Sequence, residues 1–322
     1  MKCTRCREPA EVKLRAHNSA FCRPCYLLWF GRRVARAVEH EKMFGRGDRI
    51  LVAVSGGKDS LALWDVLASE GYETVGFHLA LGIGGYSERS RRKTEEFAAV
   101  RGLRLSVHAL ADEGLAVPDV VGATRRPACS ACGTIKRHYF DAAALELGCS
   151  VVATGHNLDD EAARLLGNVL HWQMDHLARQ RPVMQPRHEK FVRKVKPLYL
   201  TSELETASYA FLRGIDYVVE ECPNAVGATQ LAYKGVLDGL ESNSPGTKLS
   251  FVRDFVARAS ERFDAPASSD VARSCAGCGM PSFGELCSFC LLRAEVDRRL
   301  RARDAVRSDR HAGEGKTPAP TA

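Results

Sequence analysis

The 322-residue chain has no long apolar run. Its most apolar stretches, such as Ile50 to Ser55 and Val151 to Thr154, have the length of a strand. A membrane-spanning helix needs roughly 20 apolar residues. The N-terminus, Met1 to Cys6, also lacks the apolar segment of a secretory signal. We therefore expect a protein with no membrane segment that works in the cytoplasm.

The chain also has little need of disulfide bonds, because 322 residues with 45% apolar content can bury a large core. In a reducing cytoplasm its 12 cysteines are expected to bind metals. They fall into a front, a middle and a back group. These groups are Cys3, Cys6, Cys22, Cys25, then Cys129, Cys132, Cys149, Cys222, and last Cys275, Cys278, Cys287, Cys290.

Net charge says little about partners. The formal value is +7, but it counts each cysteine as neutral. If the front and back groups each hold a divalent zinc with four thiolates, each site adds about −2, and the total falls to about +3. Local basic clusters are more informative, although each is also compatible with a solvated helix face. They are Arg32, Arg33, Arg36, then Arg89, Arg91, Arg92, Lys93, Arg125, Arg126, Lys136, Arg137, and last Arg298, Arg299, Arg301, Arg303.

Short β-branched segments alternate with amphipathic segments between the outer cysteine groups. The expected strands are Ile50 to Val54, Thr74 to Leu79, Leu103 to His108, Val151 to Thr154 and Tyr217 to Val219. The alternation predicts an α/β fold, a doubly wound and mostly parallel sheet with helices on both faces. We expect domains at 1–30, 31–264 and 270–302, a small polar linker at Ala265 to Asp270, and a disordered tail at 303–322.

The front and back cysteine groups each consist of two Cys-x-x-Cys pairs. Each pair bends around a turn so that two sulfurs face one ion, and a tetrahedral zinc needs two such pairs. Gly277 and Gly279 suit the tight turn of the back group. We expect two structural Zn²⁺ ions, because four thiolates leave no open position for catalysis. Contact between these ribbons and RNA is a separate hypothesis, based on basic residues such as Arg5 and Arg15.

The segment Ser55-Gly56-Gly57-Lys58-Asp59-Ser60 follows an apolar strand and precedes an amphipathic helix. Glycines let the backbone approach an anion, and the N–H groups of the helix start point at it. Ser55, Lys58 and Ser60 add donors. The spacing does not fit a Walker A loop. It resembles the PP-loop of the N-type ATP pyrophosphatases, which grip the β and γ phosphates of ATP and cleave at the α phosphorus; the alternative is a generic turn.

Two further segments are expected at the same edge of the sheet. Leu81 to Ser87 and Gly155 to Glu161 each follow a strand, and ligands bind where parallel strands end. Asp160 is a candidate ligand for Mg²⁺ on the phosphates of ATP, with Asp59 reaching the same region. For Asp159 an equally good alternative is favourable charge at a helix N-terminus.

The middle group offers Cys129-x-x-Cys132 and the distant Cys222. Three thiolates make an incomplete zinc site, but they would hold a [4Fe-4S] cluster and leave one iron open to sulfide. One alternative is a persulfide relay, in which one of these cysteines carries the sulfur and another resolves it. The other alternative is that the three thiols are unrelated. The nearby Lys136 and Arg137 favour thiolates. Cys149 is expected to be a small core residue.

Taken together, these motifs resemble the TtuA-type tRNA 2-thiouridine synthetases, within the TtcA/TtuA group of PP-loop ATP pyrophosphatases. The resemblance covers roughly residues 1 to 300. It implies ATP-dependent adenylation of the C2 carbonyl of a tRNA uridine, followed by replacement of the oxygen with sulfur. It also implies a ubiquitin-like thiocarboxylated carrier protein as the sulfur source, and a homodimer.

The resemblance also implies roles for individual residues. Cys129, Cys132 and Cys222 would ligate a [4Fe-4S] cluster, and Asp59, Lys136, Asp160, Cys132 and Cys222 would serve catalysis. The ATP-binding set would be Ala53, Val54, Ser55, Gly56, Gly57, Lys58, Asp59, Ser60, Leu79, Lys136 and Gly155. One departure from the family is His138, where a tyrosine is expected.

The target uridine is either 5-methyluridine 54 of the T-loop, which we favour, or the wobble uridine. A second hypothesis is a PP-loop ATP pyrophosphatase that uses a nitrogen nucleophile, although the sequence shows no glutaminase-like domain that would supply ammonia. A nonenzymatic zinc-ribbon adaptor that binds RNA is a third.

Overall fold

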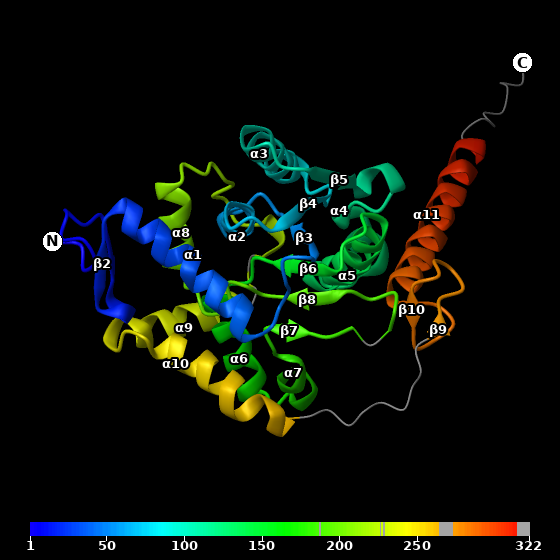
Figure 1. Cartoon of the computed structure of the whole chain (residues 1–322). Helices are drawn as coiled ribbons and strands as arrows, with labels where there is room; N and C mark the ends of the chain where they lie inside the picture. The colour runs from blue at the N-terminus through cyan, green and yellow to red at the C-terminus, as the bar shows by residue number, and fades with distance from the viewer. Residues whose placement is uncertain (187, 226, 228, 264–272, 314–322) are drawn as a thin grey trace, which may run out of the picture.

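The computed structural model describes residues 1–186, 188–225, 227, 229–263 and 273–313. A six-stranded sheet in the order β5-β4-β3-β6-β8-β7 forms its centre (Figure 1). All neighbouring strands are parallel except β7, which runs antiparallel to β8 at one edge. The strands are β3 (Arg49–Ala53), β4 (Glu73–Ala80), β5 (Leu105–Ala109), β6 (Val151–Thr154), β7 (Val183–Met184) and β8 (Arg193–Val195).

Four of the expected strands are present, and the predicted doubly wound α/β class is confirmed. The strand expected at Tyr217 to Val219 is wrong. Its backbone makes no ladder with the sheet; instead, the N–H of Val218 donates to the carbonyl of Gly56, beyond the end of β3, at 2.9 Å. The fifth parallel strand is β8. It has three residues, two of them basic, and therefore shows no alternating apolar pattern.

Helices cover both faces of the sheet, as Figure 1 shows. Strand β3 is apolar on both sides, which requires cover on both faces of the sheet. Ile50 and Val52 pack into one core cluster and Leu51 packs into the other, and all three side chains are fully buried. The helices are α1 (Arg23–His40), α2 (Lys58–Ser69), α3 (Gly84–Arg101), α4 (Val117–Thr124), α5 (Ala128–Glu146), α6 (Leu158–Leu170), α7 (Met174–Arg179), α8 (Glu203–Leu212), α9 (Thr229–Asn243), α10 (Thr247–Asp254) and α11 (Ser288–Gly313).

A buried carboxylate ties three of these helices together. Asp65 of α2 is 1% exposed. It accepts hydrogen bonds from Arg101 of α3 at 2.5 Å, and from Arg213 and Tyr209 of the α8 region at 2.6 and 2.7 Å. Burial alone would raise the pKa of Asp65, but the two guanidinium groups hold it below the usual range. The ion pairs are therefore present at neutral pH.

The outer cysteine groups lie beside small hairpins at opposite ends of the molecule in Figure 1. The front hairpin is β1 (Val12–Leu14) with β2 (Ser19–Phe21), and the back hairpin is β9 (Arg273–Ser274) with β10 (Pro281–Ser282). The expected linker, Ala265 to Asp270, lies outside the described residues. Helix α11 continues to Gly313, past residue 303, where the disordered tail was expected to begin. The reason is that residues 303–313 still contain alanine and arginine, which favour helix.

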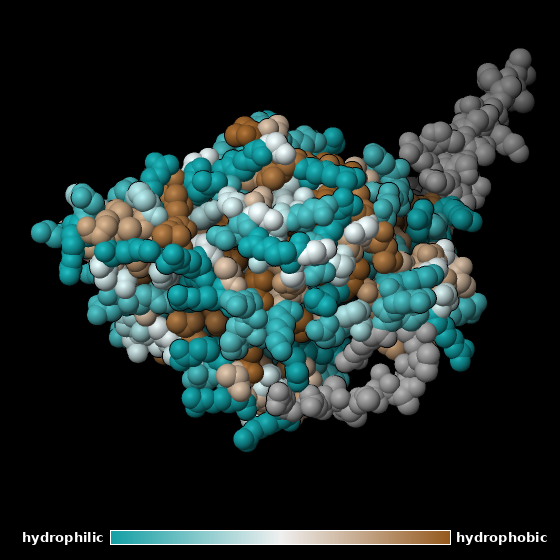
Figure 2. Space-filling model, in the orientation of Figure 1, coloured by the Kyte–Doolittle hydropathy of each residue, from teal (hydrophilic) through white to brown (hydrophobic). Residues whose placement is uncertain are grey.

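Within the described ranges, no helix combines the length and the apolar character needed to cross a membrane. The face seen in Figure 2 is mostly hydrophilic, with hydrophobic side chains in small groups.

Candidate active site

The loop after β3 has the conformation that an anion cradle requires. Helix α2 begins at Lys58 with Gly57 as its N-cap, and no side chain caps its first turn. The N–H groups at this helix start are therefore open to a ligand. Gly56 has a φ of +78°, and a Cβ there would lie 2.6 Å from the carbonyl oxygen of Ser90. Only glycine fits this position.

The loop after β6 packs directly against this cradle. A Cβ on Gly155 would lie 2.8 Å from the backbone nitrogen of Ser60. Ser60 itself orders the cradle, since its hydroxyl accepts from the N–H of Ser55 at 3.1 Å and donates to the carbonyl of Gly57 at 2.9 Å. Strands β3 and β6 are neighbours from which the chain winds in opposite directions, so both loops lie at the topological switch point.

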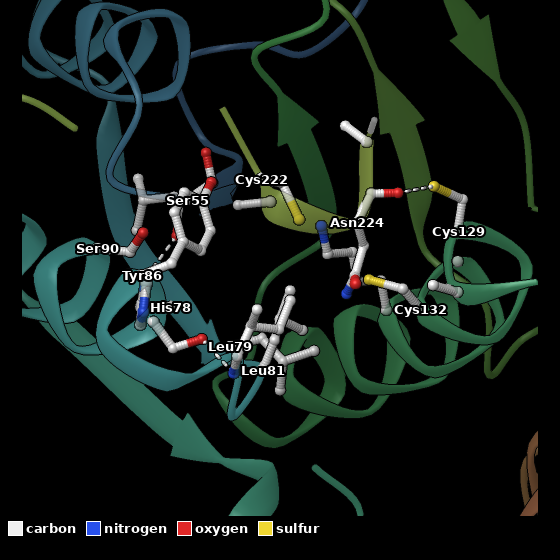
Figure 3. Close-up of a pocket in the computed structure, with 18 of the residues that line it drawn as sticks. Ser55, His78, Leu79, Leu81, Tyr86, Ser90, Cys129, Cys132, Cys222 and Asn224 are labelled. Carbon is white, nitrogen blue, oxygen red and sulfur yellow. Dashed lines mark hydrogen bonds between the residues drawn. The ribbon is translucent and has the colours of Figure 1, made fainter. Parts of the chain in front are cut away.

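A cavity of 320 Å³ joins the start of the cradle to the middle cysteines (Figure 3). Its wall includes Tyr86 and Asn224 besides eight residues expected at the site. Those eight are Ala53, Val54, Ser55, Leu79, Cys129, Cys132, Lys136 and Cys222. The other expected residues do not line the cavity; Gly56, Gly57, Lys58, Asp59, Ser60, Gly155 and Asp160 lie in the adjoining loops and helix starts.

The three middle cysteines reach the cavity from two segments. Cys129 and Cys132 lie in the first turns of α5, and Cys222 precedes the 3-10 turn Pro223–Ala225. Figure 3 shows all three around Asn224, whose carbonyl lies 3.7 Å from the sulfur of Cys129. Cys149, by contrast, is 4% exposed and packs in the core with α5, as expected for a small apolar residue.

The spacing of the sulfurs differs between the middle and outer groups. Among the described residues, the two outer groups bring all four sulfurs within 4.8 Å of one another, whereas the middle cysteines form no such group. Zn–S bonds of about 2.3 Å in a tetrahedron place sulfurs about 3.8 Å apart. The outer groups match one ion each, with Cys6 and Cys22 at 3.5 Å and Cys278 and Cys287 at 3.6 Å. A four-iron cluster binds each thiolate to a different iron and needs wider spacing.

The environment of Cys132 combines burial with a cation. Burial raises the pKa of its thiol, and Lys136, one helical turn later, offsets only part of that effect. Tyr86 lies on the opposite wall of the cavity, and burial together with the nearby Cys222 raises the pKa of its phenol. Tyr86 therefore keeps its proton at neutral pH and can donate a hydrogen bond to a group bound in the cavity.

Charged groups beside the cradle form a network that sequence reasoning missed. The ammonium of Lys58 lies 3.1 Å from Asp59 and 2.6 Å from Glu203 of α8. Burial raises the pKa of Asp59, and Lys58 with the hydroxyl of Thr206 only partly offsets it. The one available sequence signal was the pattern Ser202-x-x-Glu205, which predicts a helix start and does form a capping box.

Asp160 and Asp159 open helix α6 and carry different partners. Asp160 completes a capping box with Asn157 and lies 2.6 Å from the ammonium of Lys234. Burial would raise the pKa of Asp160, but Lys234 outweighs it and leaves the pKa below the usual value. Asp159 pairs with Lys248 at 2.5 Å. Lys234 and Lys248 belong to no motif, so sequence reasoning could not find them.

One thiol in each outer cysteine group has a lowered pKa. Burial would raise the pKa of Cys275, yet N–H donors from Cys287 and Gly277 hold it at about 6, below the usual 9.0. Backbone donors likewise hold the pKa of Cys3 at about 6 against the effect of burial.

The back ribbon packs against α5 through Phe289, whose ring stacks on the ring of His138 with 3.9 Å between the ring centroids. That stacking gives His138 a structural role at the position where tyrosine was expected.

Two family models match the chain. Residues 2–27 match "2-thiouridine synthetase TtuA, N-terminal LIM domain", and residues 30–226 match the PP-loop domain. The tRNA-5-methyluridine(54) 2-sulfurtransferase of Thermus thermophilus is 48% identical over 94% of each chain. The enzyme of that name from Thermotoga maritima is 41% identical over 93% of this chain and 98% of its own.

More distant relatives act on tRNA as well. Cytoplasmic tRNA 2-thiolation protein 1 of Saccharomyces cerevisiae is 27% identical over 96% of this chain and 90% of its own. Among solved structures, the U34-tRNA thiolase NcsA of Methanococcus maripaludis with its [4Fe-4S] cluster is similar, with a TM-score of 0.71 and 27% identity. The match covers 79% of this chain and 86% of that one.

Proposed function

The chain belongs to the TtuA family of tRNA 2-sulfurtransferases, and we propose that it converts 5-methyluridine 54 of tRNA to its 2-thio form at the expense of ATP. The observation that carries this proposal is the shared cavity. Ser55 of the phosphate cradle, Lys136 and the three middle cysteines line one space of 320 Å³. Phosphate activation and sulfur delivery therefore take place within reach of one bound base.

The first chemical step is adenylation. The C2 carbonyl oxygen of the uridine attacks the α phosphorus of ATP, the bond between the α phosphorus and the bridging oxygen breaks, and pyrophosphate leaves. Lys136 in the cavity and Lys58 beside the cradle offset the charge that develops on the phosphates, which is the electrostatic part of catalysis. We also propose that this step uses Mg²⁺ bound to the phosphates of ATP. Asp160 is the candidate ligand for the ion, and Asp59 lies in the same region.

The second step exchanges oxygen for sulfur. A sulfur nucleophile adds to C2, and the C2–O bond breaks so that AMP leaves with the former carbonyl oxygen. A free oxide would be a poor leaving group, and the phosphate ester makes it a good one. We propose that the sulfur comes from a thiocarboxylated ubiquitin-like carrier protein. Water adds to the thiocarboxylate carbon, the C–S bond breaks, sulfide leaves, and the carrier ends as a carboxylate.

Cys129, Cys132 and Cys222 fit a [4Fe-4S] cluster better than a single ion, because they line one cavity without meeting the spacing of a tetrahedral site. When bound, such a cluster would supply one iron that no cysteine occupies and that is open to sulfide. The likeness to NcsA, which contains a [4Fe-4S] cluster, supports this assignment. A persulfide relay through the same cysteines is the alternative.

The remaining assignments follow from the family. We propose zinc in both outer cysteine groups, a homodimer and a cytoplasmic location. Position 54 is favoured over the wobble position because the relatives named for 5-methyluridine 54 are 41% and 48% identical, against 27% for the U34 thiolase. We keep the proposed domains at 1–30, 31–264 and 270–302, with helix α11 of the last one running on to Gly313.

An anaerobic comparison of cysteine variants tests the proposal. The wild-type protein should absorb light near about 400 nm through iron–sulfur charge transfer and should thiolate tRNA with ATP and sulfide. Cys132→Ser and Cys222→Ser should lose both properties. Cys149→Ala is the matched control, since Cys149 is buried outside the cavity, and it should keep both.

Two outcomes would overturn the assignment. Wild-type protein that binds no iron and forms no 2-thiouridine would contradict sulfur transfer. ATP-dependent modification of tRNA that survives in Cys132→Ser and Cys222→Ser would instead favour a nitrogen nucleophile on the same PP-loop scaffold. The persulfide alternative predicts thiolation by wild-type protein without iron, provided that a persulfide donor replaces sulfide, because sulfide alone cannot form a cysteine persulfide without an oxidant.

A further inference from the structure

A second cavity, also of 320 Å³, lies where the N-terminal ribbon meets helix α1. Three arginines line it: Arg5 from the turn between Cys3 and Cys6, and Arg32 and Arg36 from α1. All three are exposed, and none of them has a carboxylate partner in the described part of the chain. The hydroxyl-bearing residues Thr4 and Ser19 complete its polar wall.

A bound anion would relieve a charge repulsion in this cavity. Arg32 and Arg36 are four residues apart on one helix face, and like charges at that spacing repel each other. The arginine between them behaves differently, since Arg33 lies 3.6 Å from Glu205 and donates to the carbonyl of Leu200. Three arginines without a carboxylate partner among the described residues thus line one hollow. The hollow therefore has the chemistry of a phosphate site.

Aromatic residues in the wall indicate which part of a nucleic acid would bind. Trp29 lines the cavity, but Phe21 stacks on its ring at 5.5 Å and the guanidinium of Arg33 lies over it at 5.5 Å. A ring engaged in this way is poorly placed to stack on a nucleobase. Trp29 therefore acts as an apolar wall that holds the arginines in place, and the cavity suits backbone phosphate rather than a base.

The ribbon is anchored to the helix that contacts the ATP cradle. His17 lies 2.6 Å from the carboxylate of Glu205, and the hydroxyl of Tyr26 donates to the Glu205 carbonyl at 2.7 Å. Two residues earlier on α8, Glu203 contacts Lys58 of the cradle. A polyanion bound at the ribbon cavity is thus held in a fixed relation to the site of adenylation.

We infer that the cavity formed by Arg5, Arg32 and Arg36 binds the phosphodiester backbone of the substrate tRNA and positions it for reaction. This inference rests on the proposed function, because it takes the bound polyanion to be tRNA. Phosphate contacts of this kind add affinity and set orientation without reading sequence.

The test compares two double variants with the same change in charge. Arg32→Glu/Arg36→Glu alters the cavity, and Arg253→Glu/Arg258→Glu alters two exposed arginines of the α10 region as the control. Affinity for a labelled tRNA transcript is measured by fluorescence anisotropy over a range of salt concentrations, on the metal-loaded protein. The cavity variant should bind tRNA at least about tenfold more weakly, with a salt slope lower by about 2. Its affinity for ATP should not change.

A charge-neutral variant shows whether the effect comes from the loss of positive charge or from damage to the fold. Arg32→Gln/Arg36→Gln removes the charge without reversing it, and should show the same direction with unchanged zinc content. Equal tRNA affinity of the cavity variant and the wild type, or equal weakening in the control, would overturn the inference. So would a loss of affinity for inorganic pyrophosphate alone, since that identifies a small-anion site. Binding is measured without thiolation, so wild-type protein that binds tRNA here but makes no 2-thiouridine would contradict only the proposed function.

Discussion

The ammonium of Lys58 lies 2.6 Å from a carboxylate oxygen of Glu203, the first residue of helix α8. The same helix holds the N-terminal ribbon through Glu205, so a single element links the ribbon to the phosphate cradle. Burial lowers the pKa of Lys58, but Asp59 and Glu203 outweigh it and leave the pKa above its usual value. Lys58 therefore carries its positive charge throughout the physiological pH range.

Replacing Lys58 tests whether that charge acts on ATP. Lys58→Ala should reduce the release of AMP and pyrophosphate by about 100-fold or more, the usual cost of removing one group that stabilises a developing charge. Lys58→Arg keeps the charge and should retain more activity than Lys58→Ala. The rate of AMP release by each variant is measured in single-turnover reactions with tRNA. Thiolation of tRNA at the wild-type rate by Lys58→Ala would contradict this role for Lys58.

Asp65 should matter for stability rather than for chemistry. Asp65→Asn would remove the buried charge that pairs with Arg101 and Arg213. Because both arginine side chains reach solvent, we expect the cost of a lost charged hydrogen bond, about 1.5 to 3 kcal/mol. Asp216→Asn is the control, because Asp216 is exposed and its pair with Lys93 should contribute less than about 1 kcal/mol. Denaturant unfolding of both variants measures the difference. Equal stabilities would refute the role given to Asp65.

Because His156 has a lowered pKa, we expect the free energy of unfolding to decrease in mild acid. Burial, with help from Lys196, lowers the pKa of His156 from 6.5 to about 4. The unfolded chain takes up a proton near pH 6.5 and the folded chain does not, so this contribution is complete above pH 6.5 and is lost as the pH falls toward 4. Since one pKa unit corresponds to about 1.4 kcal/mol, the loss is at most about 3 kcal/mol.

The free energy of unfolding at several pH values checks this prediction. Between pH 7 and about 4, wild-type protein should lose more stability than His156→Gln. His40→Gln is the control, because the side chain of His40 is 82% exposed and its removal should leave the pH dependence as in wild type. Parallel curves for wild type and His156→Gln would contradict the account.

Local patterns predicted the parts of the site that depend on neighbouring residues. The strand, the two glycines and the helix start of the cradle were all visible in one short segment, as were the cysteine pairs. The partners of Lys58, Asp159 and Asp160 were not, because Glu203, Lys248 and Lys234 come from helices more than 70 residues along the chain and make contact only after folding. Strand β8 was missed for a related reason, since pairing with β6 overrides its weak local preference.

The measurement that tests the central claim most directly is position-mapped mass spectrometry of tRNA nucleosides after reaction. The account predicts that metal-loaded wild-type protein, given ATP and a thiocarboxylated carrier, forms 2-thio-5-methyluridine at position 54, and that Cys132→Ser forms none. A 2-thiouridine confined to position 34, or sulfur at position 54 at the wild-type level in Cys132→Ser, would contradict it.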